Sequence, residues 1–289
     1  MGNYRKPQKK VHRGFFYLDD ETVINSLSAM ESGKIDEVVA KVNSAREGGF
    51  GGGVGIPGAT VEGSKKSNSA FEEEMVRIRT RFSVFELWYQ SLVNAKALGS
   101  FDGWGPNVLV DVHPGDTLEF RGHLAATPLQ TLLRLYLWFA DKAKGQGHMF
   151  SQKGEELKST KDAERIIRML LGDAADEDDQ VVILATPKGD AGPKVAMPIK
   201  TKWLIGKFGQ FGGEYSVVAQ VDRILNEGEK MPALRLTHDV AATQLEIDTL
   251  VESIQGFKEP AKAMSMVITD DDAAISGPAL WLEPIAIYR

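Results

Sequence analysis

The chain has 289 residues, of which 26% are charged and 43% are hydrophobic, ordinary values for a globular protein. It contains no cysteine, which excludes disulfides, thiolate metal sites and cysteine nucleophiles and fits a reducing compartment. No apolar run reaches the ~18 residues that would span a bilayer, and no secretory signal is expected at the N-terminus. The sequence therefore predicts a cytoplasmic protein without a transmembrane segment.

The net charge of −6 is unevenly distributed along the chain. Residues 1–13 form a basic tail without any acid, and its cations are Arg5, Lys6, Lys9, Lys10 and Arg13. The rest of the chain has 29 basic and 40 acidic residues, a net charge of −11, which does not favour contact with phosphates. We therefore expect nucleic acid or an anionic surface to contact the protein only through this tail, whose five cations are candidate partner-binding residues. A solvated terminus is the simpler interpretation.

The first predicted unit is a short strand followed by a helix. Phe15–Leu18 is an apolar run, and Asp19 or Asp20 can cap the helix that follows. Four apolar residues then recur on one helical face: Val23, Ile24, Leu27 and Met30. We interpret the two aspartates as caps, with catalysis as the remote alternative.

A glycine-rich stretch, GGFGGGVGIPGATVEGSKK, covers residues 48–66 and matches the dinucleotide pattern G-x-G-x-x-G at residues 53–58. That fingerprint requires a buried strand before it and a helix after it, and neither is indicated here. Pro57 also removes an amide that a phosphate would use. We therefore expect a flexible loop over residues 47–70 and no nucleotide cofactor. A helix over Met75–Leu92 is predicted next, with its wide apolar face toward the core.

Turn and strand signals follow, and then a well-marked helix. Residues 117–124 alternate polar and apolar side chains, which is typical of a half-buried strand. The sequence from Thr127 to Gln130 is a capping box with proline at the first helical position. The helix over Leu129–Ala140 is apolar nearly all round, so we expect it to be deeply buried.

The remaining elements alternate irregularly. We expect a loop over 145–158, a helix through Ala163–Leu171, a strand at Val181–Thr186 and a loop from residue 187 that could separate two regions. In the last third we expect these elements: a strand over 214–225, a helix opened by the capping box Thr243–Glu246, and closing strands near Met264–Thr269 and Ala279–Tyr288.

This order of elements predicts an α+β fold with a mixed or mainly antiparallel sheet and several amphipathic helices. We expect an α+β region over residues 14–186 and a second one over residues 187–289, with the alternative that both pack as one unit.

A metal-dependent nuclease is the most specific catalytic hypothesis that the residues allow. Such sites hold magnesium with an acid and a following acid–x–lysine on a strand. Asp111 and the segment Glu119-Phe120-Arg121 imitate this arrangement, with arginine in place of lysine. Alternation puts Glu119 and Arg121 on one strand face, where a solvated cross-strand pair is the simpler interpretation. No other spacing indicates a metal site, so we expect no metal and no cofactor.

Three segments are similar to an uncharacterised family of bacterial proteins that carries only a domain-of-unknown-function label. They are FFYLDDETVINSLSAMESGK near the start, HPGDTLEFRGHL in the middle and GPALWLEPIAIYR at the end. The resemblance covers nearly the whole chain and implies a bacterial protein, but it carries no catalytic residue across. Our leading hypothesis is therefore a non-catalytic binding or regulatory accessory protein with a protein partner, and the alternative is a metal-dependent hydrolase or nuclease.

Overall fold

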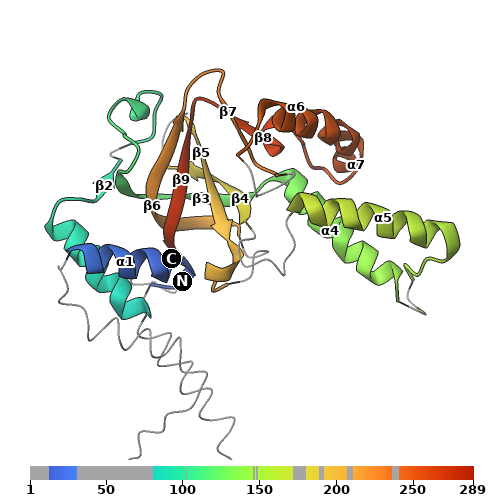
Figure 1. The fold of residues 1–289 in the computed structure, drawn as a ribbon, viewed down its shortest axis with the longest axis horizontal. Helices are drawn as coiled ribbons and strands as arrows, with labels where there is room; N and C mark the ends of the chain where they lie inside the picture. Colours follow the sequence, from blue (N-terminus) through green and yellow to red (C-terminus); the bar gives the residue numbers. More distant parts are fainter. Residues whose placement is uncertain are drawn as a thin grey trace, which may run out of the picture. The chain divides into compact units, whose positions relative to one another are not determined.

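A computed structural model describes residues 13–30, 81–101, 103–145, 147, 149–171, 180–188, 192–206, 211–235 and 241–289 (Figure 1). Its contacts divide the chain into two compact units, one of Asp19–Leu98 and one of Met1–Leu18 with Gly99–Arg289. The expected loop over residues 47–70 lies outside the described residues, and so do four of the five tail cations: Arg5, Lys6, Lys9 and Lys10.

The smaller unit contains α1 (Asp20–Met30) and a helix over residues 81–94. The Asp19 carboxylate accepts a hydrogen bond from the Thr22 main-chain nitrogen at 3.0 Å, so the prediction that an aspartate caps this helix is confirmed. Arg81 and Asp20 form an ion pair of 2.6 Å that joins the two helices. Their buried apolar side chains are Val23, Ile24, Leu27, Val84, Phe85, Trp88 and Leu92.

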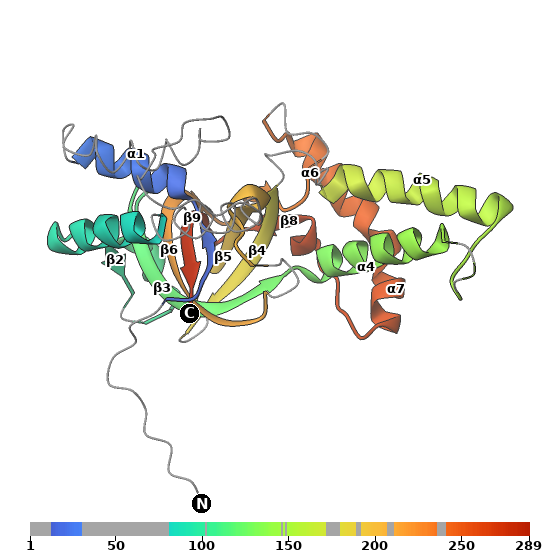
Figure 2. The same ribbon diagram turned by 90° about the horizontal axis from the view of Figure 1, so that it is seen from below.

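The larger unit is built around a closed ring of five strands: β3 (Thr117–Ala126), β4 (Gln180–Pro187), β5 (Lys194–Lys200), β6 (Gly213–Leu225) and β9 (Ala279–Tyr288). β3 pairs antiparallel with β4, and β4 pairs antiparallel with β5. β5 pairs parallel with β9, which pairs antiparallel with β6, and β6 returns to β3 (Figure 2). We number the ring strands from one to five in chain order, so that β3 is the first strand and β9 the fifth. Neighbours around the ring then follow the order 1-2-3-5-4-1. This order is the connectivity of the OB-fold, a small Greek-key barrel.

The α+β class with mostly antiparallel pairing is confirmed. Strands from both sides of residue 187 share one sheet, because β3 and β4 pair with β5, β6 and β9. Two short strands extend the ring: β1 (Phe15–Leu18) pairs antiparallel with β9, and β2 (Gly99–Ser100) pairs parallel with β3.

Alternate side chains of the ring fill its interior and make the main core. Buried members of this core include Leu118, Phe120, Leu124, Ile183, Met197, Ile199, Val217, Val221, Leu282 and Ile287. Gly122 stands where β3 passes from pairing with β6 to pairing with β4 as well. An added Cβ at Gly122 would lie 2.8 Å from the Thr186 carbonyl oxygen, so the close approach of the two strands requires glycine.

Two insertions carry the helices of this unit, and Figure 1 shows them grouped beside the barrel. The first, between β3 and β4, contains α4 (Pro128–Ala143) and α5 (Gly154–Leu171). The second, between β6 and β9, contains β7 (Lys230–Pro232), α6 (Gln244–Ser253), α7 (Lys258–Ala263) and β8 (Ala274–Ser276), and β7 pairs antiparallel with β8. Both insertions contribute to one core, whose members include Leu129, Leu133, Ile167, Leu250, Ile254 and Ala261.

Asp272, which is 3% exposed, joins the two insertions by hydrogen bonds. One carboxylate oxygen accepts from the Leu129 main-chain nitrogen at 2.9 Å, at the start of α4. The other oxygen accepts from the Thr269 nitrogen at 2.8 Å. The side chain thus caps α4 from a segment that lies 143 residues away in the chain.

A second buried carboxylate, Glu164, joins α5 to the end of α4. Lys144 Nζ lies 2.7 Å from Glu164 Oε2, and Arg168 Nη2 lies 2.9 Å from Oε1. The hydrogen bond from Lys144, together with that from Arg168, lowers the pKa of Glu164 although burial opposes the shift.

Three expectations about local structure are wrong. The expected loop over 145–158 ends early, because α5 begins at Gly154 with acidic residues that suit a helix N-terminus. The expected strand at Met264–Thr269 is irregular, since α7 ends at Ala263 and the alternating apolar residues find no strand partner. Only one side of α4 is covered, so Leu135 and Trp138 are 46% and 50% exposed.

Candidate functional site

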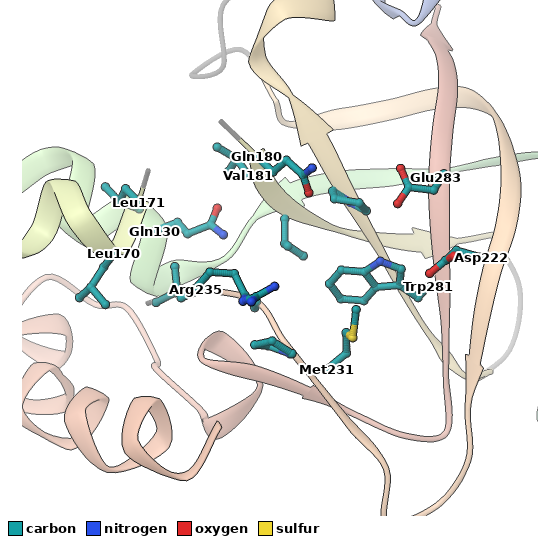
Figure 3. A pocket seen from close by; sticks show the side chains of 15 residues that line it. Gln130, Leu170, Leu171, Gln180, Val181, Asp222, Met231, Arg235, Trp281 and Glu283 are labelled. Atoms are coloured by element: carbon teal, nitrogen blue, oxygen red, sulfur yellow. The ribbon is translucent and has the colours of Figure 1, made fainter. Parts of the chain in front are cut away.

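A cleft of ≈140 Å³ lies where the outer face of the barrel meets the two insertions (Figure 3). Strands β4, β5, β6 and β9 line one side, and helices α4 and α5 with the residues of and after β7 line the other. Its polar lining residues are Gln130, Gln180, Asp222, Arg235 and Glu283. OB-folds bind ligands on the face of their second and third strands, between the loops that follow the first and fourth strands. β4 and β5 and the two insertions occupy these positions here.

The second insertion covers part of that barrel face. Met231 and Ala233 from the second insertion pack with Val182 on β4, Ala196 on β5 and Trp281 on β9. These contacts occupy part of the groove in which an OB-fold binds an oligonucleotide, and the cleft lies beside this apolar cluster.

Gln130 is the most unusual residue of the cleft, because its side-chain oxygen is buried and has no hydrogen-bond partner. The residue is 1% exposed and lies in the first turn of α4. Its main-chain nitrogen donates to Thr127 Oγ1 at 3.3 Å, so the cap that the sequence predicts is present. The side chain lines the cleft (Figure 3). It makes no hydrogen bond to the Thr127 main-chain nitrogen, which would be the second bond of a capping box. A buried acceptor without a donor costs about 1–3 kcal/mol.

Two carboxylates stand on the barrel side of the cleft. Asp222 lies at a bulge of β6, where the pairing with β9 shifts between Val221 and Arg223, and a bulge redirects a side chain from the strand surface. Glu283 lies on the neighbouring strand β9, opposite Gln220. In Figure 3 both carboxylates lie on one side of the Trp281 ring, and Arg235 lies on its other side.

The single lining cation, Arg235, has its own carboxylate partner. Its Nε lies 3.1 Å from Glu246 Oε1, and the Glu246 side chain is 8% exposed. The acidic side chains of the lining are Asp222 and Glu283. The arrangement is rich in hydrogen-bond acceptors and suits a ligand that donates hydrogen bonds.

The structure gives each of the predicted catalytic residues surroundings of its own. Glu119 and Arg121 lie on the outward face of β3, as the alternation predicts, but Glu119 accepts a hydrogen bond from the Tyr288 hydroxyl. Arg121 pairs with Glu214 at 3.1 Å, a cross-strand ion pair, and Asp111 follows a 3-10 helix on an exposed segment. Across the part of the chain that the structure describes, no group of three or more His, Asp or Glu side chains could hold a metal ion.

Sequence reasoning missed the residues of the cleft. In the sequence, Gln130 belongs to a predicted capping box, and Asp222 and Trp281 lie within predicted strands without any mark of their own. The signal in the sequence is weak, because each residue has an ordinary local role. Only the tertiary arrangement shows that the side-chain oxygen of Gln130 gains no hydrogen bond where it lies.

A family model matches residues 12–288 of the chain. The chain belongs to the family described as Domain of unknown function (DUF6414). The expected membership of an uncharacterised family is confirmed, and the bacterial origin stays a prediction. No curated protein and no solved structure matches the chain. Within the described residues, no helix is long and apolar enough to cross a membrane.

Proposed function

We propose that this member of the DUF6414 family is a non-catalytic binding protein with a regulatory or accessory role, and that its cleft receives a basic side chain of a protein partner. The observation that carries this proposal is the buried, unpartnered oxygen of Gln130 in a cleft that two carboxylates flank. The absence of cysteine supports a cytoplasmic setting for this role.

The chemistry of the lining favours a cationic donor. An arginine guanidinium offers five N–H donors and no acceptor, so it suits a cleft whose lining includes the Gln130 oxygen and the carboxylates of Asp222 and Glu283. Trp281, which is 5% exposed, adds an apolar wall beside these groups. An anion would instead meet two like charges on the barrel side of the cleft.

The size of the cleft limits the ligand to a single group. At ≈140 Å³ it is close to the ~150 Å³ of an engineered cavity that admits one benzene ring. That volume accommodates the head of an arginine or lysine side chain, whereas a folded domain or a dinucleotide is too large. A net charge of −6 on the whole chain would also steer a basic partner toward this surface.

The proposal can be tested with N-acetyl-arginine amide and its neutral isostere N-acetyl-citrulline amide. Tryptophan fluorescence and the melting temperature of the full chain are followed as each compound is added, because a ligand that binds the native state raises its stability. We expect the arginine compound to bind at least tenfold more tightly than the citrulline compound. The variant Asp222→Asn should weaken this binding, and Glu252→Gln, an exposed carboxylate elsewhere on the same unit, should not.

Equal binding of the two compounds, or no binding of either, would refute a site for basic side chains. Magnesium and manganese serve as a further pair of additives in the same melting experiment. A stabilisation by either ion that is lost in Glu119→Gln would support the alternative of a metal-dependent hydrolase instead.

A further inference from the structure

A second cavity, of ≈340 Å³, lies away from the cleft, at the C-terminal end of β9. Three arginines from separate parts of the larger unit line it: Arg13, which precedes β1, Arg121 on β3, and Arg289 after β9. Tyr215 and Tyr288 line the same cavity. Of the five tail cations proposed from the sequence, Arg13 therefore lies in a folded site.

The two tyrosines hold two of the arginines in place. The Arg289 guanidinium lies 4.3 Å from the centre of the Tyr215 ring, and its Nη2 donates to the Tyr215 hydroxyl at 2.9 Å. The same nitrogen donates to the Gly212 carbonyl at 3.1 Å. The Arg13 guanidinium lies 4.9 Å from the centre of the Tyr288 ring. Stacking on an aromatic face fixes a guanidinium plane before any ligand arrives, which lowers the entropy lost on binding.

The described side chains at the cavity include more cations than carboxylates. Glu214 pairs with Arg121 at 3.1 Å, and Glu119 accepts from the Tyr288 hydroxyl beside the cavity. Among the described residues, the side chains that line or adjoin the cavity thus carry three guanidinium groups and two carboxylates. A guanidinium has five N–H donors in a planar fork, so Arg121 can hold Glu214 through Nη2 and still offer donors to an anion.

We propose that this cavity binds the phosphate group of a small phosphorylated molecule. Planar arginine forks match the oxygens of a phosphate and bind it through charge-assisted hydrogen bonds. The volume of ≈340 Å³ lies at the lower end of the range for small-molecule pockets, so the phosphate and an attached group fit together. This site goes beyond the proposed function, because its preference is for an anion and the cleft prefers a cation.

The test uses the full chain with inorganic pyrophosphate, adenosine 5′-monophosphate, adenosine and a ten-nucleotide single-stranded DNA as probes. Isothermal titration calorimetry measures the affinity for each. We expect pyrophosphate and the monophosphate to bind and adenosine not to bind. Arg121→Gln and Arg289→Gln should each reduce these affinities at least tenfold. The matched control Arg165→Gln removes an exposed arginine of α5 and should leave them unchanged.

Binding of the single-stranded DNA without binding of the monophosphate would overturn the proposal, because the site would then belong to a nucleic-acid surface. Equal affinities in the wild type and in the Arg121→Gln and Arg289→Gln variants would overturn it as well. The melting temperature of each variant shows whether it is folded. Arg121 lies in an exposed ion pair worth about 0–1 kcal/mol, so its removal should leave the fold intact.

Discussion

Replacing Gln130 with leucine should stabilise the protein and at the same time weaken ligand binding. The wild type keeps a buried acceptor without a partner, at a cost of about 1–3 kcal/mol. Leucine has a similar volume and no polar atom to satisfy, so we expect the free energy of unfolding to rise by about 1 kcal/mol. For a chain of this length that corresponds to roughly 2 °C in melting temperature.

The cap of α4 does not confound this experiment. Gln130 contributes its main-chain nitrogen to the bond with Thr127, and any residue other than proline supplies that nitrogen. A matched control is Gln180→Leu, which changes a half-buried glutamine of the same cleft. Because water reaches that side chain, its replacement should change stability by less than about 0.5 kcal/mol.

Urea unfolding of the two variants and the wild type measures the stability difference, and titration with N-acetyl-arginine amide measures the binding difference. A side chain with a purely structural role would show the opposite pattern, with stability lost and binding unchanged. A loss of 1 kcal/mol or more in Gln130→Leu would show that the oxygen is satisfied in the native protein, and the reasoning about the cleft would be refuted.

Three further changes test the architecture around the cleft. Asp272→Ala should lower the free energy of unfolding by about 3 kcal/mol in urea titrations, because it leaves the Leu129 nitrogen and its neighbours without their buried acceptor; a loss below 1 kcal/mol would contradict the assigned link. Glu164 has a lowered pKa in the folded state, so its ion pairs stabilise the fold at pH values above the unfolded pKa of about 4.3. This stabilisation is lost as the pH falls through the lower pKa of the folded state. The stability difference between wild type and Glu164→Gln should therefore be larger at pH 7 than at pH 3, and an equal difference at both would refute the ion-pair assignment. Gly122→Val should cost about 1–3 kcal/mol or more, measured as a lower melting temperature, because its Cβ would lie 2.8 Å from the Thr186 oxygen; an unchanged melting temperature would show that the strands can separate.

Helices and strands that a few neighbouring residues mark could be predicted from the sequence. The alternation over residues 117–124 marks β3, and the capping residues Thr127 and Thr243 mark the starts of α4 and α6. The closure of the barrel could not be predicted in this way. It depends on β3 pairing with β6 across about 100 residues, and on the parallel pairing of β5 with β9, which no short pattern encodes.

The candidate sites could likewise be predicted only in their local features. The sequence predicts that Glu119 and Arg121 share a strand face, as they do in the structure. It does not predict that Tyr288 donates a hydrogen bond to Glu119 or that Glu214 forms an ion pair with Arg121. The tail cation Arg13 was recognised by its charge, while its position over a tyrosine ring depends on the pairing of β1 with β9. When a site is assembled from distant strands, the sequence contains its residues, but only the fold shows which of them lie together.

The two proposed sites lie on one strand and prefer opposite charges. Trp281 lies near the beginning of β9 and Tyr288 at its end, so at about 3.3 Å per residue their Cα atoms are roughly 23 Å apart. That separation exceeds the ~8 Å Debye length at physiological ionic strength, so a ligand at one site is largely screened from charge at the other. Because β9 pairs with β6 along nearly its whole length and the two sites lie near its opposite ends, we expect that they can be occupied together. Occupied together, the two proposed sites would hold a protein partner and a small phosphorylated ligand near opposite ends of β9.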